Sequence, residues 1–164
     1  MPSAKEMEKA IESLAILIAD PNVYTRKLTR MMLVNLGAKT IFEVGDGVAA
    51  LDAIRNVSPD VMILNWDLPI LDGTEVMRIV RSPGVFPKPG LPIIMLTDVG
   101  KRSRVTQAVR LGVHEFLVKP VSPKTLQQRL LGILFRPRPM VRAGKYYIPM
   151  PRRRVDLKEF IYAA

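Results

Sequence analysis

A short apolar run that ends in polar residues is the first part of this chain with the makings of a chemical site. Residues 61–64 are Val, Met, Ile and Leu, and Asn65 and Asp67 follow within three positions. Pro69 and Gly73 are typical of a loop, so the pattern predicts a buried strand that runs into a turn. A carboxylate at the strand end could act as a nucleophile or hold a cation. Asn65, which closes the strand, is an amide and has no nucleophilic carboxylate oxygen.

Five apolar runs alternate along the chain with amphipathic segments. Most of the runs are nearly continuous in Ile, Leu, Val and Met, as expected when helices cover both faces of a parallel sheet. The runs are Leu14–Ala19, Thr40–Val44, Val61–Leu64, Pro92–Leu96 and Glu115–Val118. Apolar residues at helical spacing lie between them, including Leu28, Met31 and Met32, then Val105, Ala108 and Val109, then Leu126, Leu130, Ile133 and Leu134. The alternation predicts a doubly wound α/β domain.

The composition shows where the charge of the chain is concentrated. The 164 residues carry a net charge of +10 and no cysteine, and no run reaches 18 apolar residues. Disulfides and thiolate metal sites are therefore excluded, a transmembrane helix is not expected, and the cytosol is compatible with this usage. From Arg136 onward eight basic residues face only Asp156 and Glu159, a net charge of +6. This asymmetry indicates an interaction arm rather than a basic fold.

Several motifs in the same order resemble the receiver domains of bacterial response regulators, the CheY-like family. They are Asp20 after the first run, the 61–73 segment, Thr97, Phe116, and the Lys119-Pro120 pair. The resemblance spans about residues 15–135. It implies a five-stranded parallel sheet of order 2-1-3-4-5, with the site at the carboxyl ends of the strands. It also implies a cytoplasmic protein of two-component, phosphorelay signal transduction.

Two positions depart from the pattern that this resemblance implies. Receivers carry an Asp four residues before the loop proline, where it takes a phosphoryl group from a histidine kinase, and here that position is Asn65. They also carry two adjacent acids after the first strand that help to bind Mg²⁺, and here these positions are Asp20 and Pro21. At an effective dielectric of ~20, a unit charge a few ångströms away is worth on the order of 4 kcal/mol. We therefore expect no phosphoacceptor at Asn65 and weak or lost Mg²⁺ binding.

The remaining pocket positions follow the family. By resemblance, Thr97 would hydrogen-bond a phosphoryl group, Phe116 would be the aromatic switch residue, and Lys119-Pro120 would have a cis peptide bond. With Asp20 as the surviving acid, we expect a direct ion pair between Lys119 and Asp20. A two-state surface can be biased by any ligand that prefers one state, so a partner or another ligand could set this switch, or it could be fixed.

Other polar residues have ordinary structural explanations. Asp67 is expected to face solvent from the loop, although it is also the one alternative phosphoacceptor. Asp72 before Gly73 is expected to be a turn or cap residue. Asp98 is expected to cap a helix or lie on the surface. The lone His114 has no second ligand at metal-site spacing and is expected to be structural or exposed.

Two segments flank the receiver-like domain, which we place at residues 13–135. Residues 1–12 are an N-terminal extension that could form a helical turn or two. Residues 136–164 form an Arg/Pro-rich tail, in which prolines prevent a continuous helix. We predict an extended arm with a short helix over 155–162. Its arginines are Arg136, Arg138, Arg142, Arg152, Arg153 and Arg154.

The tail leaves several functions open. Its guanidinium groups suit phosphates, and Tyr146 and Tyr147 could stack on bases. The alternatives are a solubilising extension, an arm that folds back on its own domain, a site for a protein partner, and a site for a phosphate-rich ligand. That ligand could be a cyclic dinucleotide such as c-di-GMP, a nucleic acid or an anionic membrane.

Together these features predict a stand-alone, non-catalytic regulatory module without a cofactor. It would act by protein–protein interaction, with a histidine kinase or another signalling protein as partner, through a helix–strand–helix face or through the tail. A sensor of a phosphate-rich ligand is the alternative. A response regulator phosphorylated on Asp67 is the third hypothesis.

Overall fold

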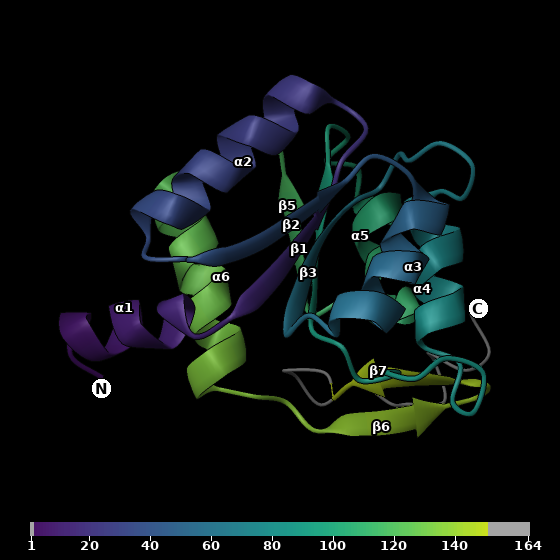
Figure 1. Ribbon diagram of the computed structural model, residues 1–164. Helices are drawn as coiled ribbons and strands as arrows, with labels where there is room; N and C mark the ends of the chain where they lie inside the picture. The colour runs from purple at the N-terminus through teal and green to yellow at the C-terminus, as the bar shows by residue number, and fades with distance from the viewer. Residues whose placement is uncertain (1, 151–164) are drawn as a thin grey trace.

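A parallel sheet lies at the centre of the protein (Figure 1), in a computed structural model that describes residues 2–150. The strands are β1 (Ala15–Ala19), β2 (Thr40–Val44), β3 (Val61–Asn65), β4 (Ile93–Thr97) and β5 (Glu115–Val118). They pair in parallel in the order β2-β1-β3-β4-β5, which confirms the predicted fold class. The register places Ile63 of β3 between Ile18 of β1 and Ile94 of β4.

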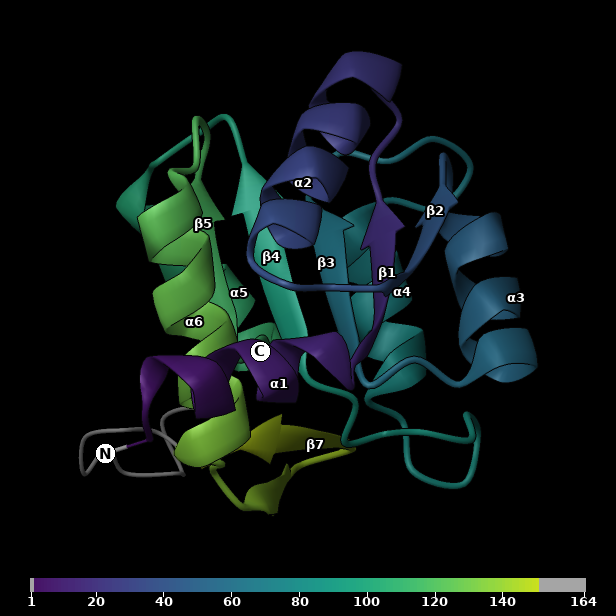
Figure 2. The same ribbon diagram turned by 60° about the vertical axis from the view of Figure 1, so that its left-hand side comes forward.

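Helices cover both faces of the sheet, as Figures 1 and 2 show. The helices α2 (Val23–Asn35) and α6 (Pro123–Phe135) lie on one face, and α3 (Gly47–Val57), α4 (Gly73–Val80) and α5 (Arg102–Leu111) lie on the other. Successive strand residues point to opposite faces, so Ile16 and Ile18 join the core under α2 and α6 while Leu17 joins the core on the other side. The continuous apolar strands of the sequence are therefore buried on both faces.

The first residues of α2, α4 and α6 are fixed by side-chain caps. Asn22 accepts hydrogen bonds from the backbone of Tyr24 and Thr25, and Ser122 accepts one from Thr125. Asp72 accepts hydrogen bonds from the backbone N–H groups of Thr74 and Glu75, which confirms its predicted role as a cap.

Gly73, the first residue of α4, brings the loop after β3 back onto the end of that strand. Its backbone N–H donates to the carbonyl of Trp66 at 2.8 Å. A Cβ atom at this position would lie 2.6 Å from the carbonyl oxygen of Asn65, so only glycine fits so close to the strand end. The loop that carries Asp67 is thus held against the carboxyl edge of the sheet.

On two helices, some of the apolar side chains at helical spacing are exposed to solvent. On α2, Leu28 and Met31 are 57% and 60% exposed, whereas Thr29 and Leu33 are the buried residues. On α5, Ala108 is buried while Val105 and Val109 are each 39% exposed. The helical period of these segments is correct, but only part of the apolar stripe packs on the core.

The N-terminal extension forms α1 (Ala4–Glu12), in agreement with the expected helical turns. Its Ile11 is fully buried in the core cluster under α2 and α6. Glu12 pairs with Lys39 at 2.8 Å. The extension is therefore packed as part of the domain.

The prediction of an extended arm is wrong for residues 140–149, which form a β-hairpin below the sheet (Figure 1). Its strands are β6 (Met140–Ala143) and β7 (Tyr146–Pro149), joined by a turn in which Gly144 has a φ of 62°. Ile148 is buried, and the backbone N–H of Tyr147 donates to the carbonyl of Arg81. These residues therefore match the alternative prediction that the arm folds back on its own domain.

Pro137 and Pro139 precede β6, and Pro149 is the last residue of β7, so none of these three stands in the middle of a hairpin strand, which explains why their presence did not exclude a sheet. The predicted helix over 155–162, and Arg152, Arg153 and Arg154, lie outside the described residues. Within the described residues, none of the helices has both the length and the apolar character that crossing a membrane requires.

Candidate functional site

The predicted pocket residues gather at the carboxyl edge of the sheet. Asp20 follows β1, Asn65 closes β3, Thr97 closes β4, and Lys119 follows β5. Because parallel strands end at the same edge, four distant parts of the sequence meet there. Asp20, Asn65 and Thr97 are buried, and the Lys119 side chain is only 15% exposed.

Asp20 is the centre of the pocket, and several hydrogen-bond donors surround its carboxylate. Oδ1 accepts from the backbone N–H of Asn22 at 2.9 Å and from Nδ2 of Asn65 at 3.4 Å. Oδ2 accepts from the hydroxyl of Thr25 at 2.5 Å and lies 3.5 Å from Nζ of Lys119. A buried carboxylate requires such partners, and here both oxygens are engaged by the protein itself.

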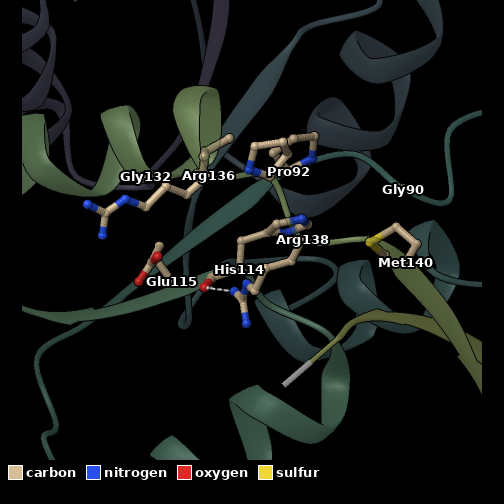
Figure 3. Close-up of a pocket in the computed structure, with 10 residues that line it drawn as sticks. Gly90, Pro92, His114, Glu115, Gly132, Arg136, Arg138 and Met140 are labelled. Atoms are coloured by element: carbon tan, nitrogen blue, oxygen red, sulfur yellow. Dashed lines mark hydrogen bonds between the residues drawn. The ribbon is translucent and has the colours of Figure 1, made fainter. Parts of the chain in front are cut away.

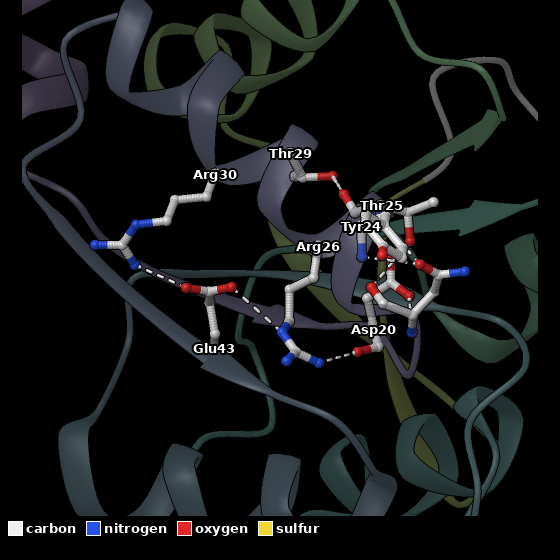
Figure 4. A network of polar contacts seen from close by, with 8 residues as sticks. Asp20, Tyr24, Thr25, Arg26, Thr29, Arg30 and Glu43 are labelled. Atoms are coloured by element: carbon white, nitrogen blue, oxygen red, sulfur yellow. Dashed lines mark hydrogen bonds and ion pairs between the residues drawn. The ribbon is translucent and has the colours of Figure 1, made fainter.

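The same aspartate fastens α2 to the sheet (Figure 4). Arg26 of α2 donates to the backbone carbonyl of Asp20 at 2.7 Å and pairs with Glu43 of β2 at 3.2 Å. Arg30 also pairs with Glu43, at 3.0 Å. The first half of α2 is therefore held by polar contacts to the ends of β1 and β2.

The contact between Lys119 and Asp20 confirms the predicted ion pair, and the Lys119-Pro120 peptide bond is cis, as the resemblance implied. The ammonium group points into the pocket and toward its remaining acid. Pro21, at the second acidic position of the family pattern, is exposed and offers no side-chain oxygen.

The donor set does not fit a magnesium ion. Mg²⁺ is bound through carboxylate oxygens and water in near-octahedral geometry. Both oxygens of Asp20 already accept hydrogen bonds, Asn65 turns its Nδ2 toward Asp20, and Lys119 brings a positive charge to the same place. No group of three or more acidic, His or Cys residues that could hold a metal occurs in the described part of the chain.

Arg104 of α5 reaches into this pocket, which the sequence analysis did not foresee. Its Nη1 donates to the hydroxyl of Thr97 at 2.7 Å and lies 3.6 Å from Oδ2 of Asp67. Its guanidinium carbon lies 4.8 Å from the centre of the Trp66 ring, a cation–π distance. Thr97, the predicted phosphoryl-binding hydroxyl, is thus occupied by an arginine of the protein.

Phe116 of β5 packs against the Trp66 ring that Arg104 contacts. Its ring packs edge-on against Trp66, with the ring centres 6.3 Å apart and an angle of 87° between the planes. Trp66 is therefore contacted by the predicted aromatic switch residue and by Arg104. No local pattern around Arg104 marked it, because it stands in a short basic stretch that is typical of a solvated surface.

His114 precedes β5, at the opposite edge of the sheet from the pocket, whereas Asp98 directly follows Thr97. Asp98 is an exposed surface acid, one of its two expected places. His114 is structural: its Nδ1 lies 3.3 Å from both the backbone nitrogen of Ile93 and Nη2 of Arg81. Burial, with Arg81 and Arg138 nearby, lowers the pKa of His114 to about 3, so the ring is neutral at pH 7.

The predicted tail arginines that the structure describes lie away from the pocket, near the amino edge of the sheet or on the hairpin. Arg136 follows α6, Arg138 precedes β6 and Arg142 lies within β6. Arg138 donates to the backbone carbonyl of His114, and Arg142 to that of Gly144 at 3.3 Å. Tyr146 and Tyr147, expected as stacking residues, are half-buried strand residues of β7.

Comparison with known proteins gives the class of this fold and site. The response regulator receiver domain family matches residues 16–131. CheY1 of Helicobacter pylori is 31% identical over 120 residues, which cover 73% of this chain and 95% of that protein. CheY-3 of Vibrio cholerae is 28% identical over 125 residues, which cover 76% and 95% of the two chains.

The solved structures agree with the sequence comparison. The structure of the Vibrio cholerae chemotaxis protein CheY4 superposes with a TM-score of 0.66 and 27% identity, over 74% of this chain and all of that one. This chain therefore belongs to the response regulator receiver domain family and is a CheY-like receiver domain of two-component signalling.

Proposed function

We propose that this chain is a receiver domain that takes no phosphoryl group and that regulates by docking onto a signalling protein. The observation that carries the proposal is Asn65, which closes β3 beside Asp20. The CheY-like resemblance puts the phosphoacceptor aspartate at this position, and an amide cannot form an acyl phosphate. On this proposal the chain is not an enzyme and works in the cytoplasm.

The surroundings of Asn65 support the proposal. A phosphoacceptor receiver needs a metal to neutralise the transferred group. The hydrogen-bond donors around the Asp20 carboxylate leave little room for such a metal. Arg104 and Lys119 supply fixed positive charges in the pocket instead. These contacts would hold Thr97 and Phe116 in one arrangement without phosphorylation.

Asp67 is a poor substitute acceptor. Its side chain is 69% exposed and points to Arg104 rather than to Lys119. It also stands two residues beyond the end of β3, in the loop that Gly73 holds back. We therefore expect no phosphorylation of Asp67.

The docking surface that we propose is the face formed by α5, β5 and α6. Val105 and Val109 of α5 and Val118 of β5 are each between 39% and 43% exposed. Exposed apolar residues from adjacent elements, rimmed by basic ones such as Arg102, suit a protein partner. A histidine kinase or another signalling protein is the class of partner that we propose.

Trp66 is next to Asn65 and in contact with Arg104, so its fluorescence can test whether the pocket at Asn65 binds Mg²⁺ and a phosphoryl mimic. We would titrate the full chain with Mg²⁺ and then with beryllofluoride, a mimic of a phosphorylated aspartate, and compare Asn65→Asp. The expected result is no change in Trp66 emission for the natural chain. A saturable response of the natural chain to both additions would contradict the proposal.

Asp67 needs a separate measurement. Incubation with Mg²⁺ and the small phosphodonor acetyl phosphate, followed by intact mass, should give no phosphoryl adduct. An adduct that disappears in Asp67→Ala would instead support the third hypothesis. The alternative function, binding of a phosphate-rich ligand, uses other residues and does not depend on the outcome of either measurement.

A further inference from the structure

A groove lies on the face of the sheet that α2 and α6 cover (Figure 2), near the carboxyl ends of the strands. Its volume is about 350 Å³, which is within the range of small-molecule sites. Residues of α2 line it together with the end of β4, the loop after β5 and the first part of α6. The apolar residues of the lining are Leu28, Met32, Leu96, Pro120, Val121 and Leu126.

A cleft at the opposite edge of the sheet has a different lining. Arg129, Arg136 and Arg138 share it with Glu115, and it adjoins the hollow of about 200 Å³ that Figure 3 shows. Arg129 pairs with Glu115 at 3.1 Å, and Arg138 donates to the carbonyl of His114. Two of these guanidinium groups are therefore already engaged by the protein, whereas the groove beside α2 is mainly apolar.

The apolar lining of the groove is open to solvent. Leu28 is 57% exposed, and Met32 and Val121 are half-buried. Leu96 and Leu126 are buried and belong to the core cluster under α2 and α6. A hollow of this kind exposes apolar surface next to the core, and a ligand that covers that surface removes it from water.

Lys119 supplies a positive charge to the lining. Its side chain is 15% exposed, and its Nζ lies 3.5 Å from Oδ2 of Asp20, its one polar contact among the described residues. An ammonium group has three N–H donors, so this contact leaves donors unfilled. A mostly buried ammonium group is stabilised by a further acceptor, which a ligand in the groove can provide.

The hydroxyl groups of the lining already donate to the protein. The hydroxyl of Thr25 donates to Asp20 at 2.5 Å, and that of Thr29 donates to the carbonyl of Thr25 at 3.0 Å (Figure 4). Lys119 is therefore the side chain of the groove whose donors are still available. A ligand that fits the groove has to bring the acceptor.

Asp98 limits the charge that such a ligand can carry. Its carboxylate lines the groove from an exposed position and makes no ion pair with any other residue that the structure describes. Lys119 already faces the carboxylate of Asp20. A dianion would thus meet two negative charges and one positive charge, whereas a single carboxylate group can share the ammonium group with Asp20.

We propose that this groove binds a small apolar monocarboxylate, with its carboxylate on the ammonium group of Lys119 and its apolar part between Leu28, Met32 and Val121. Charge-assisted hydrogen bonds to an ammonium group fix the orientation, and burial of the apolar part supplies affinity. The inference goes beyond the docking function, because it does not depend on whether Asn65 accepts a phosphoryl group.

Octanoate, octanamide and octylamine are matched probes, because they share one alkyl chain and differ in the charge of the head group. We would titrate each into the full chain, below the concentration at which micelles form, and follow the methionine methyl groups by NMR. Octanoate should shift the Met32 methyl signal in a saturable way and leave that of Met7 in α1 unchanged. It should bind at least about tenfold more tightly than octylamine.

The same titrations can overturn the proposal. If the Met32 signal shows no saturable shift with octanoate, the groove is not a site for this class of ligand. Equal affinities of octanoate and octanamide would show that Lys119 does not bind the head group. Tighter binding of octylamine would show that Asp98, and not Lys119, determines the charge of the ligand.

Variants of α2 separate the groove from general adsorption to apolar surface. Leu28→Gln should weaken octanoate binding about fivefold, because Leu28 lines the groove. Met31→Gln is the matched control, since Met31 is 60% exposed on the same helix but does not line the groove, and it should change the affinity less than about twofold. Equal losses in the two variants would contradict a defined site.

The charges of the groove are tested by two further variants. Lys119→Met should lower the affinity for octanoate to that for octanamide. Because that change leaves the buried Asp20 without its ion pair, Asp98→Asn on the exposed rim provides a second test that spares the fold. Asp98→Asn should tighten octanoate binding about twofold and leave octanamide binding unchanged. Weaker octanoate binding in Asp98→Asn would contradict the proposal, and circular dichroism checks the fold of each variant.

A second copy of the chain is the competing occupant of the groove. Sedimentation of the natural chain should give a monomer whose mass does not change in Leu28→Gln. A dimer that Leu28→Gln dissociates, and that octanoate does not displace, would assign the groove to a second copy and overturn the small-molecule proposal.

Discussion

At the scale of single residues, the pocket differs from a metal-binding site in its charges. Asp20 is its only buried carboxylate in the part of the chain that the structure describes, and it faces Lys119 and the amide of Asn65. Asp67 is directed outward to Arg104. The acids that would attract a cation are thus either replaced or already neutralised by a basic side chain.

Arg104 joins the pocket to the aromatic pair, and its removal should be visible in the fluorescence of Trp66. Arg104→Met removes the hydrogen bond to Thr97, the ion pair with Asp67 and the charge over the indole ring. We expect a shifted Trp66 emission and a loss of about 1 kcal/mol in the free energy of unfolding, measured by denaturant titration.

Arg102→Met is the matched control, since Arg102 is an exposed residue of the same helix. This control should leave the Trp66 emission and the free energy of unfolding near those of the natural chain. An unchanged Trp66 spectrum in Arg104→Met would show that Arg104 does not occupy the pocket in solution.

At the scale of secondary-structure elements, a buried arginine joins α4, α5 and the hairpin. Arg81 follows α4 and is fully buried, and its guanidinium donates to the carbonyls of Gly112 at 2.9 Å and 3.0 Å and of Pro89 at 2.8 Å. Gly112 ends α5, so the charge also lies at the negative end of that helix. The Arg81 carbonyl in turn accepts from Tyr147 of β7.

Gly112 is required at this junction for steric reasons. Its φ is 90°, and a Cβ atom there would lie 3.1 Å from the Arg81 Nε, from Ile148 and from the Tyr147 carbonyl. The close approach allows the hairpin to pack on the end of α5. The short basic hairpin is therefore joined to the receiver fold by buried contacts.

Replacing Arg81 should destabilise the whole protein. Arg81→Met removes the donors to the buried carbonyl of Gly112 and to the part-buried carbonyl of Pro89, and each unsatisfied buried group costs about 1–3 kcal/mol. We expect a loss of about 3 kcal/mol in the free energy of unfolding, measured by denaturant titration.

Arg78→Met on α4 is the control, since Arg78 is exposed and, among the described residues, its side chain donates to the hydroxyl of Thr74 at 3.4 Å. It should cost less than about 0.5 kcal/mol. Equal losses in the two variants would show that the polar contacts of Arg81 contribute little.

At the scale of the whole molecule, His114 makes stability depend on pH. Its pKa is about 3 in the folded chain, below the ordinary value of 6.5. Well above pH 6.5 the His114 ring is neutral in both the folded and the unfolded chain, and its contribution to the free energy of unfolding is complete. Between pH 6.5 and 3 the unfolded chain binds a proton that the folded chain does not, so stability falls as the pH falls, by up to about 1.4 kcal/mol per pH unit.

The comparison of the natural chain with His114→Asn isolates this effect. Asn removes the titrating ring, while carboxylates such as Asp72, whose pKa is lowered by hydrogen bonds from Thr74 and Glu75 despite partial burial, titrate in both chains. The fall in unfolding free energy from pH 6.5 to 4 should be smaller in the variant. Identical pH profiles would show that His114 takes up a proton in the folded state.

Much of the domain could be predicted because its signals are local. The apolar runs predicted the five strands, and Asp72 before Gly73 predicted a helix cap. The ion pair of Lys119 and Asp20 was predictable because both residues stand at strand ends that a parallel sheet brings together. The hairpin was missed because the prolines near it were given more weight than the Tyr-Tyr-Ile strand and the Gly144 turn.

The sequence alone determined the order of strands and helices, the residues at the carboxyl edge and the amide at position 65, because periodicity, caps and residue type are properties of the chain itself. Only the tertiary structure decided that Arg104 lies on Trp66, that Arg81 is buried at the end of α5, and that Arg129, Arg136 and Arg138 share one cleft. The long side chain of arginine can lie in solvent or in the core with the same local sequence. Its place depends on which carbonyls, rings and carboxylates the folded chain brings within reach.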